Sequence, residues 1–181
     1  MRLVGALGAV AILAALAPYP AVPRESVDVG AARRTLASRA LEFPVKGHEA
    51  ALRDDFDELR GSHPHEALDI MAPRGTPVVA VDDGTIAKLF TSKPGGLTIY
   101  QYDPAKKLAY YYAHLDRFAS GLRPGGRVKR GQVIGYVGST GNARADAPHL
   151  HFTVYALPPG KQWWKGVAIN PYEKLAPPLA R

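Results

Sequence analysis

Two short segments far apart in the chain carry metal-binding side chains at the spacing of a β-strand. Alternate residues of a strand point to the same face, so His149 and His151 stand side by side while the leucine between them turns into the core. Upstream, if the chain is also extended, His65, Ala67 and Asp69 share a face and present an imidazole and a carboxylate together. Both segments reach one metal ion only if they lie next to each other in the folded chain. This requirement constrains the fold more than any other feature of the sequence.

Three nitrogen or oxygen ligands with one position left open is the pattern of a catalytic zinc site. The chain has no cysteine, so a zinc ion relies on histidine and carboxylate, and neither a disulfide framework nor a thiolate site is available. Spacing alone leaves open how the histidines divide the work, because His149 and His151 are equally placed to supply two ligands. We expect His48 and His63 to be ordinary histidines outside the site.

The body of the chain reads as one antiparallel β domain. From Phe43 onward, short β-branched and aromatic runs are cut by glycine and proline, which is typical of an all-β fold. We expect strands near residues 67–71, 77–81, 84–91, 96–102, 108–115, 132–138 and 149–156. Alternation along the hairpin that ends near Leu115 places Tyr110, Tyr112 and His114 on one face, which is a candidate lining of the site. For Tyr112 itself we expect a packed side chain, with a donor in the site as the alternative.

The first residues have the composition of an export signal. After Met1 and Arg2, the apolar run from residue 3 to residue 17 is shorter than a membrane span of about 20 residues and fits a secretory segment. We therefore predict a signal segment or membrane tether at 1–17, a linker and short helix at 18–42, with the helix over Ala31–Leu41, and a single domain at 43–181. Export places the protein in the periplasm, in the cell envelope or outside the cell.

The formal charge of +7 favours polyanionic partners. Outside the cytoplasm these are anionic envelope polymers. Nucleic acid is not expected, because no basic run is interleaved with stacking aromatic residues. Membrane contact is expected only through an uncleaved N-terminal segment, and the sequence sets no oligomeric state. The pair Trp163-Trp164 is predicted to cover the edge of the core, with sugar stacking or an interfacial patch as the alternatives.

A series of motifs runs through the domain. They are His65-Glu66-Ala67-Leu68-Asp69-Ile70, Ala72-Pro73-Arg74-Gly75-Thr76-Pro77-Val78, Asp83-Gly84-Thr85, Tyr112-Ala113-His114-Leu115, Gly131-Gln132-Val133-Ile134-Gly135, Ser139-Thr140-Gly141 and Pro148-His149-Leu150-His151-Phe152. In order and approximate spacing they resemble the LytM/lysostaphin-type zinc metalloendopeptidases. The resemblance covers roughly residues 43–176 and includes Asn170-Pro171 near its end.

The resemblance implies a division of roles that spacing does not give. One zinc ion is held by His65, Asp69 and His151, while His114 and His149 are catalytic histidines. The implied fold is a mainly β antiparallel sheet groove, the duplicated hybrid motif of LytM-type proteins, here with a short N-terminal helix. The implied substrate is the peptide part of bacterial peptidoglycan. Ala67 and Thr153 depart from the family pattern, which generally has glycine and often has glutamate at these two places.

Two other functions compete with hydrolysis. A non-catalytic envelope regulator would use the same groove to bind a wall hydrolase or a wall peptide, although all five site positions are filled here. The runs Gly84-Thr85-Ile86-Ala87-Lys88-Leu89 and Gly126-Arg127-Val128-Lys129-Arg130-Gly131-Gln132 are similar to the strand-turn rhythm of biotinyl and lipoyl carrier domains, but no lysine stands at a tight hairpin tip.

Overall fold

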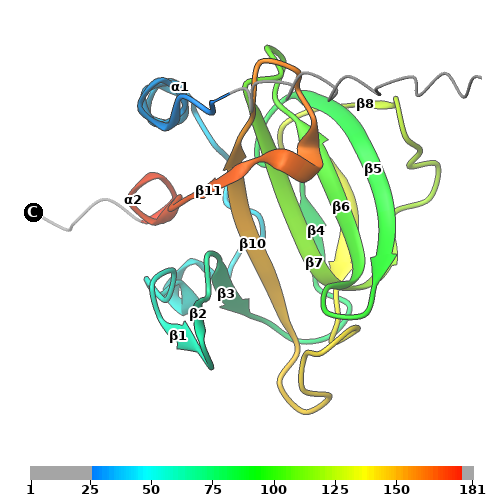
Figure 1. The fold of residues 1–181 in the computed structure, drawn as a ribbon. Coiled ribbons are helices and arrows are strands. Elements are labelled where there is room, and N and C mark those ends of the chain that lie inside the picture. The colour runs from blue at the N-terminus through cyan, green and yellow to red at the C-terminus, as the bar shows by residue number, and fades with distance from the viewer. Residues whose placement is uncertain (1–25, 177–181) are drawn as a thin grey trace, which may run out of the picture.

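The fold is a curved antiparallel sheet with short helices on one side (Figure 1). The computed structural model describes residues 26–176, so the predicted signal segment and most of the predicted linker lie outside the described residues. The main sheet has nine strands, β3 to β11. Their bounds are Leu68–Met71, Pro77–Val79, Gly84–Ser92, Gly96–Tyr102, Leu108–Phe118, Arg127–Val128, Val133–Val137, His149–Ala156 and Val167–Ile169. The predicted antiparallel, mainly β fold class is confirmed.

The smaller elements frame this sheet. They are the hairpin β1 and β2 at Leu59–Arg60 and His63–Pro64, the 3₁₀ turns η1 and η2 at Glu49–Ala51 and Trp163–Lys165, and the helices α1 and α2 at Val29–Ser38 and Tyr172–Leu175. Helix α1 is the predicted N-terminal helix, shifted towards the N-terminus because the Asp28 carboxylate caps it by accepting from the backbone N–H of Ala31. Among residues 26–176, no helix combines the length and apolar composition needed to cross a membrane.

Strand β10 is the centre of the arrangement that brings the two ligand segments together. Its first half lies between β3 and β7, and its second half lies between β7 and β11. The register with β3 sets His151 opposite Asp69, and the register with β7 sets His151 opposite Ala113. Residues directly opposite each other in an antiparallel pair share a face of the sheet. The two segments that the sequence required to be neighbours are therefore paired strands.

One face of this sheet builds the core. Leu150 and Phe152 on β10, Leu68 and Ile70 on β3, and Tyr112 on β7 are each fully buried. They pack in one hydrophobic cluster with Ile86, Ile99, Leu115 and Ile134 from the other strands and with Ala32 and Leu36 of α1. Because alternate residues face opposite ways, burying the leucine between the two histidines of β10 holds both histidines on the other face.

The prediction that Tyr110 and Tyr112 share a groove-lining face with His114 is wrong, whereas the packing expected of Tyr112 is confirmed. Both tyrosines are fully buried on the core face, and Tyr111 lines the groove instead. The physical reason is a break in the alternation of β7, where His114 has a φ of 58° and the pairing register shifts on both neighbouring strands. A bulge of this kind re-aims one side chain, so that His114 joins the groove face rather than the core.

A buried polar network fixes the two core tyrosines. The Tyr112 hydroxyl donates to Gln101 Oε1 at 2.8 Å and accepts from the backbone N–H of Val81 at 3.0 Å. Gln101 Nε2 donates to the backbone carbonyl of Asp82, and the Tyr110 hydroxyl donates to the Asp82 carboxylate. Burial, with the neighbouring charge of Asp82, holds the pKa of the Tyr110 hydroxyl far above its ordinary value, so this hydroxyl stays a donor.

We expect Tyr112→Phe to lower the free energy of unfolding by about 2–4 kcal/mol, because it leaves a buried N–H and a buried amide oxygen unpaired. Urea denaturation measures the change. The matched control is Tyr136→Phe at a partly exposed position on β9, where we expect a change within about 0.5 kcal/mol. Equal stability of Tyr112→Phe and the unchanged chain would contradict this account of the network.

Candidate metal centre

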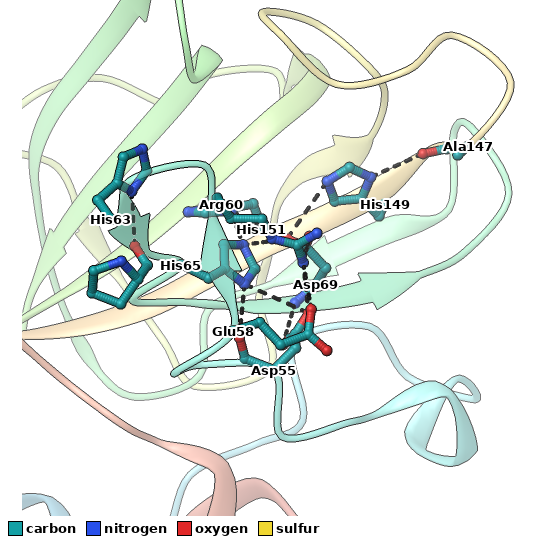
Figure 2. Close-up of polar contacts among 10 residues, drawn as sticks. Asp55, Glu58, Arg60, His63, His65, Asp69, Ala147, His149 and His151 are labelled. Atoms are coloured by element: carbon teal, nitrogen blue, oxygen red, sulfur yellow. Dashed lines mark hydrogen bonds and ion pairs between the residues drawn. The ribbon is translucent and has the colours of Figure 1, made fainter.

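Three ligand atoms converge where β3, β10 and the turn before β3 meet. His65 Nε2, Asp69 Oδ1 and His151 Nδ1 form a triangle in which each pair lies 3.1 Å apart. Figure 2 shows these three side chains pointing toward one another. Each is partly exposed, so the cluster lies at the surface of a groove rather than inside the core. The three residues that the family resemblance implies as ligands are thus brought together.

The donor set of this triangle suits a cation. The His65 Nδ1 atom lies 3.2 Å from the backbone carbonyl of Asp55, and a carbonyl oxygen only accepts, so the proton of a neutral His65 sits on Nδ1. Its Nε2 atom then presents a lone pair to Asp69 Oδ1, which also only accepts, and to His151 Nδ1, which carries at most one proton. With at most one proton among three acceptors, the cluster is short of positive charge. A bound metal ion would supply that charge.

The dimensions fit zinc. Tetrahedral Zn²⁺ with bonds of about 2.0–2.1 Å to nitrogen and oxygen places its ligand atoms about 3.3 Å apart. The observed separations of 3.1 Å are close to that spacing. Three ligands from the chain leave one coordination position of a tetrahedron for another group.

The electrostatics of the cluster favour bound positive charge. Burial alone would raise the pKa of Asp69, but hydrogen bonds with His151 and His65 and the charges of nearby histidines outweigh it and hold the pKa far below its ordinary value. Burial opposes protonation of His65, yet Asp69 and the charge of Asp55 raise the pKa of His65 above its usual range. The same oxygens that stabilise a proton here would stabilise a divalent ion.

The route of the chain through this cluster differs from the extended one that the sequence predicted. Glu66 has a φ of 58°, so the chain turns between His65 and the start of β3 at Leu68. Ala67 is fully buried rather than standing exposed on the ligand face. The two ligands meet because this left-handed turn folds His65 back over Asp69, and not because both lie on one straight strand.

Two further histidines face the same groove. The His149 Nδ1 atom lies 2.9 Å from the carbonyl of Ala147, and the His114 Nδ1 atom lies 2.8 Å from the carbonyl of Thr140. Each carbonyl fixes the proton of the neutral ring on Nδ1, which leaves Nε2 as the proton acceptor. The rings of His114 and His149 lie 4.9 Å apart, centre to centre. The structure therefore gathers all five histidine and aspartate residues that the sequence singled out.

His114 is held neutral by its surroundings. Burial, with the nearby His151 and His149, lowers its pKa to about 4. The loop that supplies the Thr140 carbonyl packs tightly against the start of β6. A Cβ on Gly141, where φ is 78°, would approach the backbone nitrogen of Gly96 to 2.3 Å. Glycine at position 141 thus permits the close approach that sets the orientation of the His114 ring.

Sequence reasoning missed two charged residues of this site. Asp55 accepts from the backbone N–H of Asp69 at 3.3 Å through Oδ1, and its Oδ2 atom lies 3.5 Å from His65 Nδ1. Arg60, on β1, lies 3.5 Å from Asp69 Oδ2 and 3.4 Å from Asp55 Oδ2 (Figure 2). Carboxylates and backbone groups behind a ligand orient it and tune its basicity. No spacing rule distinguishes Asp55 from its acidic neighbours Asp54, Asp57 and Glu58.

The five residues lie in an open groove of about 980 Å³. Its walls come from the β1–β2 hairpin, the loop that contains Arg144 and Ala147, and the sheet residues Tyr111 and Tyr155. His63 lines the rim, but it is exposed and its Nδ1 atom faces the Pro64 carbonyl at 2.9 Å. It lies outside the group of side chains that can share one metal ion. A groove of this size admits an extended peptide segment.

Comparison with known proteins assigns the chain to a family. Residues 63–171, which span the groove from the hairpin to α2, match the sequence profile of one family of metallopeptidases. The chain belongs to that family, Peptidase family M23. The predicted likeness to LytM/lysostaphin-type endopeptidases is therefore confirmed.

Relatives agree with this assignment. The L-Ala--D-Glu endopeptidase of Bacillus subtilis (strain 168) is 32% identical over 148 residues, which is 77% of this chain and 44% of that protein. The catalytic domain of lysostaphin from Staphylococcus simulans superposes with a TM-score of 0.57 at 26% identity, covering 78% of this chain and 96% of that domain. A zinc-containing peptidase from Vibrio cholerae gives a TM-score of 0.55 at 27% identity, covering 72% of this chain and 39% of that one. The chain spans less than half the length of the first curated relatives that it matches.

We expect the unchanged chain to bind one Zn²⁺ and His65→Ala to lose tight binding, because the substitution removes one of three ligand atoms. Competition against a fluorescent zinc chelator measures both affinities. His63→Ala, two residues earlier on the groove rim, is the matched control and keeps the affinity of the unchanged chain. Equal zinc affinities for His65→Ala and His63→Ala would exclude this triangle as the metal site.

Proposed function

We propose that the chain is an exported zinc endopeptidase that hydrolyses peptide bonds of bacterial peptidoglycan, in the stem or in the cross-link. The observation that carries this proposal is the convergence of His65, Asp69 and His151 within 3.1 Å of one another beside the rings of His114 and His149 in an open groove. Membership of Peptidase family M23 supports the reaction class. The Bacillus subtilis relative is named for an L-Ala–D-Glu bond, and this supports a substrate peptide that contains D-amino acids, as wall peptides do.

In this proposal His65, Asp69 and His151 hold one zinc ion. When bound, zinc supplies Lewis acidity, which lowers the pKa of water towards ~7 and polarises a peptide carbonyl. Asp69 is the only anionic ligand of the three, so the centre keeps net positive charge. That charge suits the electron-rich oxygen of a peptide carbonyl.

His149 and His114 are the proton-handling groups of the proposal. Both rings have Nδ1 fixed by a backbone carbonyl, so Nε2 is the atom that accepts a proton. The Nε2 atom of His149 lies 3.6 Å from Asp69 Oδ1 and hence next to the ligand triangle. A neutral His114, with a pKa near 4, is also available as an acceptor at neutral pH. We assign to these two rings the removal of a proton from the attacking water and its delivery to the leaving amine.

The alternative function is an envelope regulator that uses the groove to bind a wall hydrolase or a wall peptide without catalysis. The full set of three ligands and two oriented histidines favours the enzyme, because binding alone needs no such set. Export from the cytoplasm and attraction to anionic envelope polymers by the charge of +7 belong to the same proposal.

The proposal is tested on purified peptidoglycan sacculi. We expect the zinc-loaded full chain to release soluble fragments with newly formed peptide amino and carboxyl ends, and mass spectrometry of these fragments identifies the bond that is cut. His151→Ala, which removes a proposed ligand, releases none. Undiminished release after zinc has been removed by dialysis against a chelator would refute the zinc mechanism.

The roles of the histidines are separated by a second substitution. We expect His149→Ala to bind zinc as tightly as the unchanged chain but to lower kcat by about 10²–10⁴-fold, since it removes a proton acceptor and no ligand. Zinc affinity and the rate of fragment release are measured on the same preparation. A loss of zinc from His149→Ala would instead make this residue a ligand, the option that strand spacing alone leaves open.

A further inference from the structure

A row of aromatic rings continues from the metal centre along the groove face of the sheet. The ring of Tyr111 lies 6.0 Å from that of His151, centre to centre, and Tyr155 lies 6.0 Å from Tyr111. Tyr100 follows at 4.6 Å from Tyr111, and Trp163 packs on Tyr100 at 4.3 Å. The row therefore connects the proposed reaction centre with the loop after β10.

The outer end of the row is open to solvent. Trp164 lies 5.3 Å from Trp163 and is 63% exposed, while Phe90 lies 6.4 Å from Trp163 and is 42% exposed. Trp163 packs on Tyr100, but neither ring belongs to the hydrophobic core cluster or to the residues packed against it, and Trp164 is exposed. The predicted role of the tryptophan pair as a cover for the edge of the core is therefore wrong. We call the six rings the aromatic shelf: Tyr111, Tyr155, Tyr100, Trp163, Trp164 and Phe90.

The backbone holds the shelf in place. Tyr100 and Tyr111 are opposite each other in the register of β6 and β7, which puts their rings on one face. The loop with both tryptophans is tied down where the Tyr102 hydroxyl donates to the Lys161 carbonyl at 2.8 Å. Gly166 lies so close to Tyr155 that a Cβ there would approach the Tyr155 Cβ to 2.7 Å. A surface fixed in this way costs little ordering when a ligand binds.

We propose that the aromatic shelf binds the glycan strand of peptidoglycan by stacking against its amino-sugar rings. The inference rests on the proposed function, because a wall peptide that enters the groove carries its glycan with it by a covalent bond. The C–H groups on the face of a pyranose ring carry partial positive charge, and the face of an aromatic ring is negative. Flat contact also gathers dispersion attraction over many atoms.

A glycan accounts for the shelf better than a lipid surface does. The inner rings Tyr111 and Tyr155 line the same groove as the metal-binding side chains, where an extended polar polymer can follow but a bilayer cannot. The outer rings Trp164 and Phe90 would serve either partner through their apolar area alone. The row of rings is continuous from the exposed outer end to the proposed reaction centre. A strand of linked sugars is long enough to contact the row along this whole length.

The test distinguishes binding through the flat face of an aromatic ring from binding through apolar side-chain volume of any shape. Peptide-free glycan strands, prepared by removing the stem peptides from sacculi, are titrated into the zinc-loaded full chain by calorimetry. We expect Trp164→Leu combined with Phe90→Leu to weaken binding by about tenfold, and Trp164→Phe to stay within about twofold of the unchanged chain. Tyr136→Leu is the control, because that ring packs under the Arg117 guanidinium on another part of the sheet. Thermal unfolding confirms that each variant folds.

Three results would contradict glycan binding by the aromatic shelf. One is no measurable binding of glycan strands by the unchanged chain, and another is equal binding by the leucine and phenylalanine variants. The third is binding to vesicles of anionic phospholipid that Trp164→Ala abolishes while glycan binding persists, which would assign these rings to a membrane. Failure of the proposed function gives a different result. If the chain cuts no peptide but binds glycan through Trp164, glycan binding by the shelf is supported and only the hydrolase proposal is refuted.

Discussion

The site depends on the antiparallel pairing of β3 with β10. That pairing sets Asp69 opposite His151, and it is fixed because the intervening residues Leu68, Ile70, Leu150 and Phe152 are fully buried. A slip of one residue would turn the buried set into the groove and the ligands into the core. The register of β3 and β10 therefore determines both which side chains enter the hydrophobic core and which proposed ligands face each other. Burial of four apolar side chains holds the two polar ones at the distance that a metal ion needs.

The remaining parts of the site depart from regular strand geometry. His65 and His114 both reach the groove through left-handed backbone, at Glu66 in the first case and at His114 itself in the second. Such conformations are uncommon outside glycine and are maintained by the surrounding structure. In this chain the backbone N–H of His114 donates to the Gly95 carbonyl, and the backbone N–H of Glu66 donates to the Phe56 carbonyl. Because of these two left-handed residues, His65 and His114 reach the groove from positions that a regular flat strand would not give them.

The two faces of β7 divide structure from function. On one face Tyr110 and Tyr112 are locked into a buried polar network with Asp82 and Gln101. On the other, the Tyr111 ring lies beside His151, a proposed metal ligand, and belongs to the aromatic shelf that leads to Trp163. Tyrosine suits both faces because its ring buries apolar area while its hydroxyl finds a partner. The same strand thus stabilises the domain and connects the proposed reaction centre to the proposed glycan contact.

Most of the fold and all five proposed site residues were predictable from the sequence. Seven strands, β3 to β7, β9 and β10, follow from runs of β-branched and aromatic residues between glycine and proline, and the helix α1 follows from its composition. The short strands β1, β2, β8 and β11 were not predicted. His149 and His151 share a face because strand spacing is a local property of the chain. The roles implied for the five residues came from the family resemblance in the order of the motifs. No local rule of strand spacing gives these roles.

The tertiary structure alone decided which tyrosine faces the groove, how His65 reaches Asp69, and where Asp55 and Arg60 lie. It also joined Trp163 and Trp164 to rings from β5, β6, β7 and β10, which are distant in the sequence. Alternation predicts side-chain direction only while the backbone stays extended. Positive φ at Glu66 and His114 breaks that rule, and these conformations depend on contacts with residues far along the chain. The sequence by itself determined the parts and their spacing within each strand, and long-range packing decided how they meet.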